Sequence, residues 1–206
     1  PMPKASNFEE IHQAAFDVGR PHSVCVNRNG ERFVDEACSY DEFGAAMVAD
    51  QLKTGANTPC WLVFDATFRA NYTAGGFMPT ALMPDWLIPK DRWDHYIFKA
   101  NSLEALAQKI HLPLLARTVA NMNSFAKSGV DPEFGRGGNP YDCMFGDPAV
   151  TPNPCLGAIE TAPYYAVPIN LGDLGTKGGL KADARARVLD GNGQPIPGLY
   201  AAGNNA

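Results

Sequence analysis

Residues 30–44, with the sequence GERFVDEACSYDEFG, bring an arginine, several carboxylates, a cysteine and a tyrosine together in one short run. The charged residues alternate with apolar ones, so the run predicts a strand that gives way to a helix near Tyr40. Tyr40 is either a core aromatic whose hydroxyl reaches solvent or a phenol that transfers a proton. Arg32 and Glu36 are better explained by an ion pair or a turn anchor than by catalysis.

The cysteines and histidines show no spacing typical of a metal site or of a disulfide framework. The five cysteines are Cys25, Cys38, Cys60, Cys143 and Cys155, and the four histidines are His12, His22, His95 and His111. An odd number of scattered thiols without a CxxC pair favours reduced cysteines. The sequence therefore predicts neither a metal centre nor a catalytic cysteine.

The composition is that of an ordinary globular protein, with 45% hydrophobic and 19% charged residues among 206. The net charge of -5 argues against a nucleic-acid-binding surface, because such a surface needs a basic stripe. No apolar run approaches the roughly 20 residues of a membrane helix, and the first residues lack a signal-peptide pattern. We therefore expect a cytoplasmic protein, and the first residue, Pro1, suggests a processed or excised fragment.

The elements around the opening run can be predicted from their periodicity. VCVNRNGERFVDE, at 24–36, predicts a β-hairpin around Asn29 and Gly30, a pair that readily adopts a tight turn. Helical spacing follows over YDEFGAAMVADQLKTG, and Gly55 would end that helix. The continuous apolar run at 60–68 predicts a buried strand.

Two helices and two long irregular segments occupy the middle of the chain. Asn101, with a glutamate three residues later, predicts a capped helix start, and a second helix would run from about Leu114 to Gly129. Prolines and glycines break the periodicity of 69–100 and of 130–157. Loops of this length are often functional covers in compact domains.

The last 45 residues or so predict one strand and one hairpin. The strand is YYAVPINLG, and the hairpin is ARVLDGNGQPIPGLYAAGN, with its turn at DGNG. That hairpin ends in a small-residue turn, a feature found where backbone N–H groups approach a phosphate. The fold class predicted for the whole chain is α+β, with a small, mostly antiparallel sheet and packed helices.

Several of these stretches resemble a flavin-dependent family that includes fumarate reductases and 3-ketosteroid dehydrogenases. VNRNGERFVDE resembles the hairpin of that family's capping domain, and GDLGTKGGLKADARARVLDGNGQPIPGLYAAGN resembles the return from the cap into the FAD-binding domain. TGANTP, ANSLEALAQKI and SGVDPEFGRGGNPYD resemble the ketosteroid dehydrogenase branch. The resemblance covers nearly the whole chain from about Arg20 and implies an FAD-dependent oxidoreductase.

The resemblance divides the chain into three segments. Residues 1–19 would lead in from the FAD-binding domain, 20–180 would form the capping, substrate-binding domain, and 181–206 would be the return hairpin with a truncated strand of the FAD-binding domain. The G-x-G-x-x-G turn that holds the FAD pyrophosphate is not in this sequence. We therefore expect part of a larger flavoenzyme, and we expect this chain alone to be inactive and to bind no FAD.

Tyr40 falls where fumarate reductases of the family carry an arginine that donates a proton. Their Thr-Glu pair and their histidine, which bind the substrate carboxylates, would fall on Ala15-Phe16 and on Gly175, so a dicarboxylate substrate is not expected. A tyrosine suits the ketosteroid branch instead. The resemblance implies that Tyr40 is the catalytic base that removes a proton next to the ketone, while FAD accepts a hydride.

The resemblance also implies four cofactor-binding residues, which are Gly178, Gly179, Gly203 and Asn204. The first two resemble a glycine pair that lets the backbone approach the flavin ring, although they could simply form a turn. The last two resemble residues beside the ribityl and phosphate groups of FAD. The expected partners are a steroid-like apolar molecule and the FAD-binding domain, with no metal, nucleic acid or membrane span.

Two other functions stay open at this point. A fumarate-reductase-like enzyme for another unsaturated substrate would need a cationic proton donor from elsewhere in the protein. A module that binds a small apolar ligand on its own would need no flavin. The bond that a ketosteroid dehydrogenase would desaturate is open as well.

Overall fold

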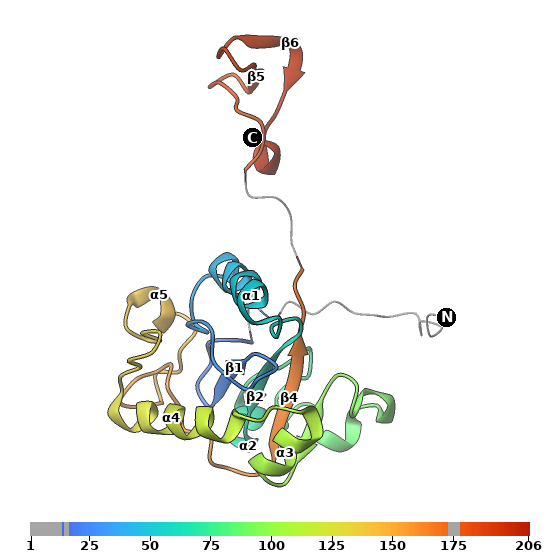
Figure 1. The fold of residues 1–206 in the computed structure, drawn as a ribbon, viewed down its shortest axis with the longest axis vertical. Coiled ribbons are helices and arrows are strands. Elements are labelled where there is room, and N and C mark those ends of the chain that lie inside the picture. The colour runs from blue at the N-terminus through green and yellow to red at the C-terminus, as the bar shows by residue number, and fades with distance from the viewer. Residues whose placement is uncertain (1–13, 15–16, 173–177) are drawn as a thin grey trace. The chain divides into compact units, whose positions relative to one another are not determined.

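The computed structural model describes residue 14 and residues 17–172 and 178–206. The chain divides into two compact units, Pro1–Leu171 and Gly172–Ala206 (Figure 1). Ala15, Phe16 and Gly175, to which the resemblance assigned the reductase's carboxylate-binding positions, lie outside the described residues.

The first unit is built on a four-stranded antiparallel sheet with the order β1-β2-β4-β3. The strands are β1 (Ser23–Val26), β2 (Cys60–Phe64), β3 (Phe98–Ala100) and β4 (Tyr164–Ile169). On β2, Val63 lies opposite Val24 of β1 on one side and opposite Ala166 of β4 on the other. The predicted α+β fold class is confirmed.

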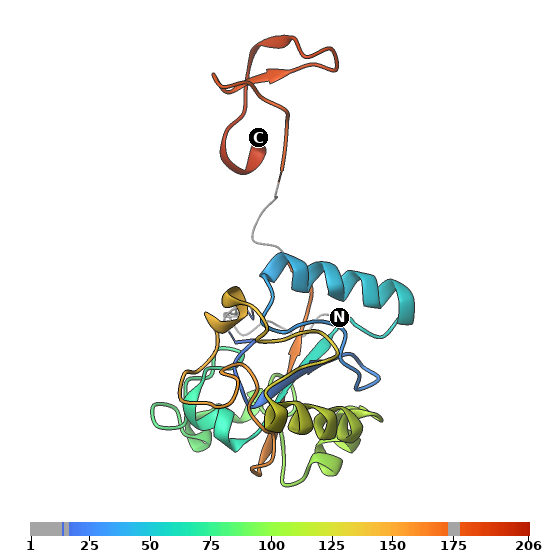
Figure 2. The ribbon, with the colours of Figure 1, turned by 90° about the vertical axis from the view of Figure 1, so that its left-hand side faces the viewer.

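Five α-helices accompany this sheet among the described residues. They are α1 (Tyr40–Thr54), α2 (Ala66–Asn71), α3 (Leu103–Ile110), α4 (Leu115–Ser128) and α5 (Pro140–Cys143). Because successive side chains of a strand point to opposite faces, the sheet carries a core on each side. Leu62 of β2 packs in a cluster with Phe43 and Met47 of α1, whereas Val63 packs with Leu106 of α3 and Val119 of α4. Figure 2 shows the strands between α1 and α4.

The helices that periodicity predicts are confirmed, with one change of cap. α1 ends at Gly55 and α4 at Gly129, and both glycines take the left-handed conformation that closes a helix. The cap predicted at Asn101 is wrong, because Ser102 accepts the bond from the N–H of Ala105, at 3.1 Å. The one-residue difference leaves the apolar stripe of α3 in place.

Two predictions about strands are wrong in their extent. The buried strand expected at 60–68 stops at Phe64, because Asp65 accepts the N–H of Phe68 and starts α2. The hairpin expected at 24–36 does not form, since β1 pairs with β2 and residues 31–36 contain no strand. The long segments 69–100 and 130–157 are largely irregular, as predicted, with short helical turns.

The second unit is a hairpin of two antiparallel strands, β5 (Arg187–Leu189) and β6 (Pro195–Tyr200). A short 3-10 helix, Gly203–Asn205, follows β6. This hairpin is the one predicted from the DGNG turn. Across both units, none of the described helices is long and apolar enough to cross a membrane.

Candidate active site around Tyr40

Tyr40 is the first residue of α1, and half of its side chain is exposed to solvent. The helix begins here because Ser39 and Glu42 form a capping box. The Glu42 carboxylate accepts the backbone N–H of Ser39 at 3.3 Å and its hydroxyl at 3.0 Å. An accessible phenol is thus placed by the start of a well-defined helix.

A tight turn over residues 35–38 leads into this helix start. The Asp35 carboxylate accepts the N–H of Ala37 at 2.8 Å, and the carbonyl of Asp35 accepts the N–H of Cys38 at 3.3 Å. The backbone of Gly19 packs directly against the turn, since a Cβ there would lie 3.0 Å from the Cα of Ala37. The turn therefore has little room to move.

Glu36, in this turn, is buried and is held by two arginines. Its carboxylate accepts Nε and Nη2 of Arg32 at 3.0 and 2.8 Å, and Nη1 of Arg136 lies 3.2 Å away. It also accepts the N–H of Cys25 on β1, at 3.2 Å. Burial alone would raise the pKa of Glu36, but the two guanidinium groups outweigh it and hold the pKa below its usual range.

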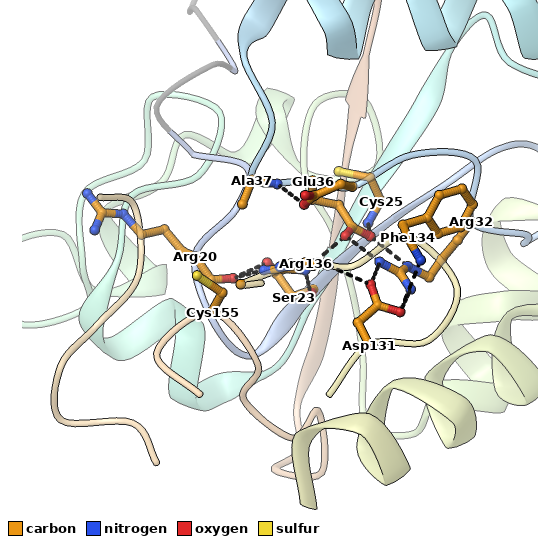
Figure 3. A network of polar contacts seen from close by, with 12 residues as sticks. Arg20, Ser23, Cys25, Arg32, Glu36, Ala37, Asp131, Phe134, Arg136 and Cys155 are labelled. Carbon is orange, nitrogen blue, oxygen red and sulfur yellow. Dashed lines mark hydrogen bonds and ion pairs between the residues drawn. The ribbon is translucent and has the colours of Figure 1, made fainter. Parts of the chain in front are cut away.

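Arg32 also binds Asp131, which lies in the long loop at 130–157, with both terminal nitrogens of its guanidinium group (Figure 3). Its Nη1 and Nη2 donate to the two oxygens of Asp131 at 3.0 and 2.8 Å, in the bidentate geometry that suits a planar guanidinium. The ring of Phe134 covers the guanidinium, with 4.9 Å from Cζ to the ring centroid. The pair is dry, since the side chains of Arg32 and Asp131 are 2% and 0% exposed.

Arg136 fastens the same loop to the strand β1 and the residues before it. Its Nη1 donates to the carbonyl of Ser23 at 2.9 Å and its Nη2 to the carbonyl of Arg20 at 2.6 Å (Figure 3). The ion pair predicted between Arg32 and Glu36 is therefore present, but it is part of a larger group. We call Arg32, Glu36, Asp131 and Arg136 the buried ion cluster.

Sequence reasoning missed the two members of this cluster that come from the long loop. Asp131 and Arg136 lie 99 and 113 positions from the residues they contact, Arg32 and Ser23. The only signal available was a set of charged residues in a Gly/Pro-rich loop, and charges in loops are usually solvated.

Asp35 is the one carboxylate of this region whose pKa rises. Burial raises the pKa of Asp35 to about 6, and the neighbouring carboxylates of Asp142 and Glu36 add to it, against the opposing effects of the Ala37 N–H and Arg136. The folded protein therefore binds a proton at Asp35 more tightly than the unfolded chain does. Stability falls as pH rises between the ordinary value of 3.8 and about 6.

Replacing Asp35 with asparagine is expected to stabilise the protein above pH 6, by about 1–2 kcal/mol, because the charge penalty disappears while the acceptor for Ala37 remains. Below pH 3.8, where Asp35 is protonated in both states, the gain should vanish. Thermal unfolding of Asp35→Asn and of the exposed control Asp91→Asn from pH 3.5 to 8 measures this. A gain that does not depend on pH would contradict the assignment.

The cysteines are free thiols in the described residues. Cys25, Cys60 and Cys155 are buried, and burial is the main reason that the pKa of Cys60 rises to about 12. A thiol with such a pKa is a poor nucleophile. Within the described ranges, no group of histidines, cysteines and carboxylates is arranged to hold a metal ion.

The four residues expected to bind a cofactor lie in the second unit. Gly178 and Gly203 have φ of +101° and +65°, and a Cβ on either would meet no atom of a described, non-neighbouring residue within 4 Å. Gly179 is different, because a Cβ there would lie 2.2 Å from the carbonyl carbon of Asn205. Asn204 belongs to the exposed 3-10 turn. Their role in binding stays a prediction.

The chain belongs to a flavoprotein family, the FAD binding domain family, whose model matches residues 9–206. A 3-oxosteroid 1-dehydrogenase of Mycolicibacterium smegmatis is 42% identical over an alignment of 198 residues that covers 93% of this chain and 34% of that protein. A 4-oxocyclohexanecarboxylate 2-dehydrogenase of Sinomonas cyclohexanicum is 38% identical over an alignment of 194 residues that covers 92% of this chain and 32% of that protein.

A crystal structure gives the same picture. It is that of 3-ketosteroid delta1-dehydrogenase from Sterolibacterium denitrificans in complex with 1,4-androstadiene-3,17-dione, with 43% identity and a TM-score of 0.86 over 94% of this chain and 34% of that one. The resemblance to the ketosteroid dehydrogenase branch is confirmed. The chain spans about a third of the length of the relatives it matches.

Proposed function

We propose that this chain forms the substrate-facing part of an FAD-dependent oxidoreductase that removes hydrogen from ring A of a 3-ketosteroid. The observation that carries the proposal is the half-exposed phenol of Tyr40, at the end of a segment anchored in the protein interior. The similarity to proteins named as dehydrogenases of ring ketones supports it. In this proposal residues 20–180 are the capping domain, and 181–206 lead into the FAD-binding domain.

In the proposed reaction, Tyr40 in its phenolate form removes a proton from the carbon next to the ketone and becomes the neutral phenol. That proton becomes acidic enough to transfer only when the ketone oxygen receives hydrogen bonds that stabilise the developing enolate. A base must then lie within hydrogen-bond reach of the proton. An exposed tyrosine on a fixed helix start meets the need for access, and its flat apolar ring suits a steroid.

The residues of the second unit fit FAD in one respect. Gly178 and Gly203 expose bare backbone in a conformation that residues with side chains rarely adopt. Such backbone allows a flat ring or a phosphate to approach its N–H groups closely. Asn204 adds an exposed amide beside Gly203. When bound, FAD would supply the acceptor for the hydride.

A substrate screen of the intact, FAD-loaded enzyme that contains this chain tests the proposed function. With an artificial electron acceptor, we expect turnover of a 3-ketosteroid that has a saturated C1–C2 bond, and kcat/KM for 4-oxocyclohexanecarboxylate at least 10-fold lower. The larger apolar surface of the steroid is the reason, since each buried CH₂ contributes about 0.8 kcal/mol.

Fumarate, offered with a reduced electron donor, is the comparison substrate in that screen. Reduction of fumarate without dehydrogenation of any ring ketone would overturn the proposed function. A kcat/KM higher for 4-oxocyclohexanecarboxylate than for the 3-ketosteroid would support dehydrogenation of a ring ketone as the reaction, but it would contradict the steroid as substrate.

A further inference from the structure

We propose that the buried ion cluster of Arg32, Glu36, Asp131 and Arg136 positions Tyr40 for proton removal, in addition to holding the loop. The inference rests on the proposed function of Tyr40 as the base. None of the four residues needs to touch the substrate, so they are positioning residues rather than catalytic ones.

The cluster and the strand β1 fix Glu36 from three directions. Arg32 binds it through two nitrogens, Arg136 approaches within 3.2 Å, and the N–H of Cys25 donates to it from β1. β1 lies at the edge of the sheet and is paired along its whole length with β2. The position of Glu36 is therefore fixed relative to the sheet.

Only three residues, 37–39, separate Glu36 from Tyr40, and all three are held. The N–H groups of Ala37 and Cys38 donate to Asp35, and the N–H of Ser39 donates to Glu42 in the first turn of α1. A shift of Glu36 therefore moves the start of α1 and Tyr40 with it, because no loose segment lies between them.

Asp131 connects the cluster to the loop that carries Arg136. Asp131 accepts the N–H groups of Glu133 and Arg136 at 3.0 and 3.2 Å, so its carboxylate also shapes the loop turn that carries Arg136. The same carboxylate orients the guanidinium of Arg32 in its plane. Loss of one charge at Asp131 would therefore loosen both arginines that hold Glu36.

The choice of charged residues is itself informative. A buried ion cluster is often no more stable than well-packed apolar residues of the same volume, because desolvation opposes the attraction. Bidentate guanidinium–carboxylate contacts, however, fix orientation as well as distance. Orientation matters for a base, since a displacement of about 1 Å can lower a rate by about 100-fold.

The experiment compares Asp131→Asn with Asp85→Asn in the intact, FAD-loaded enzyme that contains this chain. Asp85 is a matched control because it also binds a buried arginine, Arg69, at 3.2 Å, together with Lys99 and Tyr165, at a different place in the sheet unit. We expect Asp131→Asn to lower kcat for a 3-ketosteroid about 10-fold to 100-fold with KM changed less than threefold. The control should keep kcat within twofold at a similar loss of Tm.

Two further readouts separate positioning from mere loss of structure. With a substrate deuterated next to the ketone, the isotope effect on kcat should rise in Asp131→Asn and not in Asp85→Asn, because proton removal becomes slower. Added to Tyr40→Phe, Asp131→Asn should lower kcat by less than twofold further, since a misplaced base no longer matters once the base is gone.

The outcomes distinguish this inference from the proposed function. If Tyr40→Phe lowers kcat but Asp131→Asn behaves like Asp85→Asn in kcat and in isotope effect, the positioning role is wrong and Tyr40 keeps its role. If Tyr40→Phe turns over at nearly the wild-type rate, the proposed function of Tyr40 fails, and the positioning role fails with it.

Discussion

Replacing Tyr40 with phenylalanine is expected to lower kcat for a 3-ketosteroid by about 100-fold to 10,000-fold, the usual contribution of a general base. The change removes one oxygen and keeps the ring, so α1 and its capping box should persist. Ser39 and Glu42 make that box without Tyr40, so the start of the helix should keep its cap in this variant. Steady-state turnover with an artificial electron acceptor, after normalising to bound FAD, measures the effect.

The control for this variant is Tyr96→Phe. Tyr96 is 43% exposed, close to the 50% of Tyr40, but it lies in the irregular segment before β3, where the guanidinium of Arg92 covers its ring. Removal of that hydroxyl should leave kcat within twofold. A Tyr40→Phe variant that keeps more than half of the wild-type turnover would exclude Tyr40 as the base.

The two hairpin predictions show when a turn signal is sufficient. The DGNG turn is satisfied locally, since the Asp190 carboxylate accepts the N–H groups of Asn192 and Gln194 at 2.9 and 2.8 Å. Its two strands are adjacent in sequence, and the hairpin of β5 and β6 forms as predicted. Here local chemistry and pairing agree.

The NRNG turn after β1 has equally good local chemistry and yet makes no hairpin. In this turn, the carbonyl of Asn29 accepts the N–H of Leu114. A Cβ on Gly30 would lie 2.6 Å from the backbone N of Leu115. The glycine is thus required because the start of α4 packs against the turn. β1 takes a partner from residues 60–64 instead, and no local pattern identifies that long-range choice.

The residues of the candidate site likewise divide into those that local sequence predicts and those that depend on long-range contacts. The position of Tyr40 at a helix start follows from nearby residues, because capping depends on side chains within one turn. The pairing of Arg32 with Glu36 was also predictable, since the two are four positions apart. The contacts of Asp131 and Arg136 were not predictable, because the burial of their charges depends on the loop at 130–157 folding back onto β1.

The largest effect on stability is expected for Glu36→Gln, a loss of about 3–5 kcal/mol in the free energy of unfolding. Glutamine can still accept the N–H of Cys25, but it leaves Arg32 and Arg136 facing a neutral amide in a dry site. Removal of one partner from a buried ion pair leaves uncompensated charge, which costs more than the pair itself contributes. Denaturant unfolding and hydrogen exchange at the Cys25 amide measure the loss.

The pH dependence of that loss has a definite sign. Since the pKa of Glu36 lies below its ordinary value of 4.5 in the folded protein, its carboxylate contributes stability that is present above 4.5 and disappears as pH falls through the folded-state pKa. The difference in the free energy of unfolding between wild type and Glu36→Gln should therefore shrink in acid.

The matched control is Glu133→Gln. It also removes a carboxylate from Arg32, 3.2 Å away, but one that is 36% exposed. We expect that control to change stability by less than about 1 kcal/mol, because solvent screens an exposed pair. Equal losses in the two variants would mean that burial does not decide the strength of these contacts, and the anchoring of Glu36 to the sheet would then need another cause.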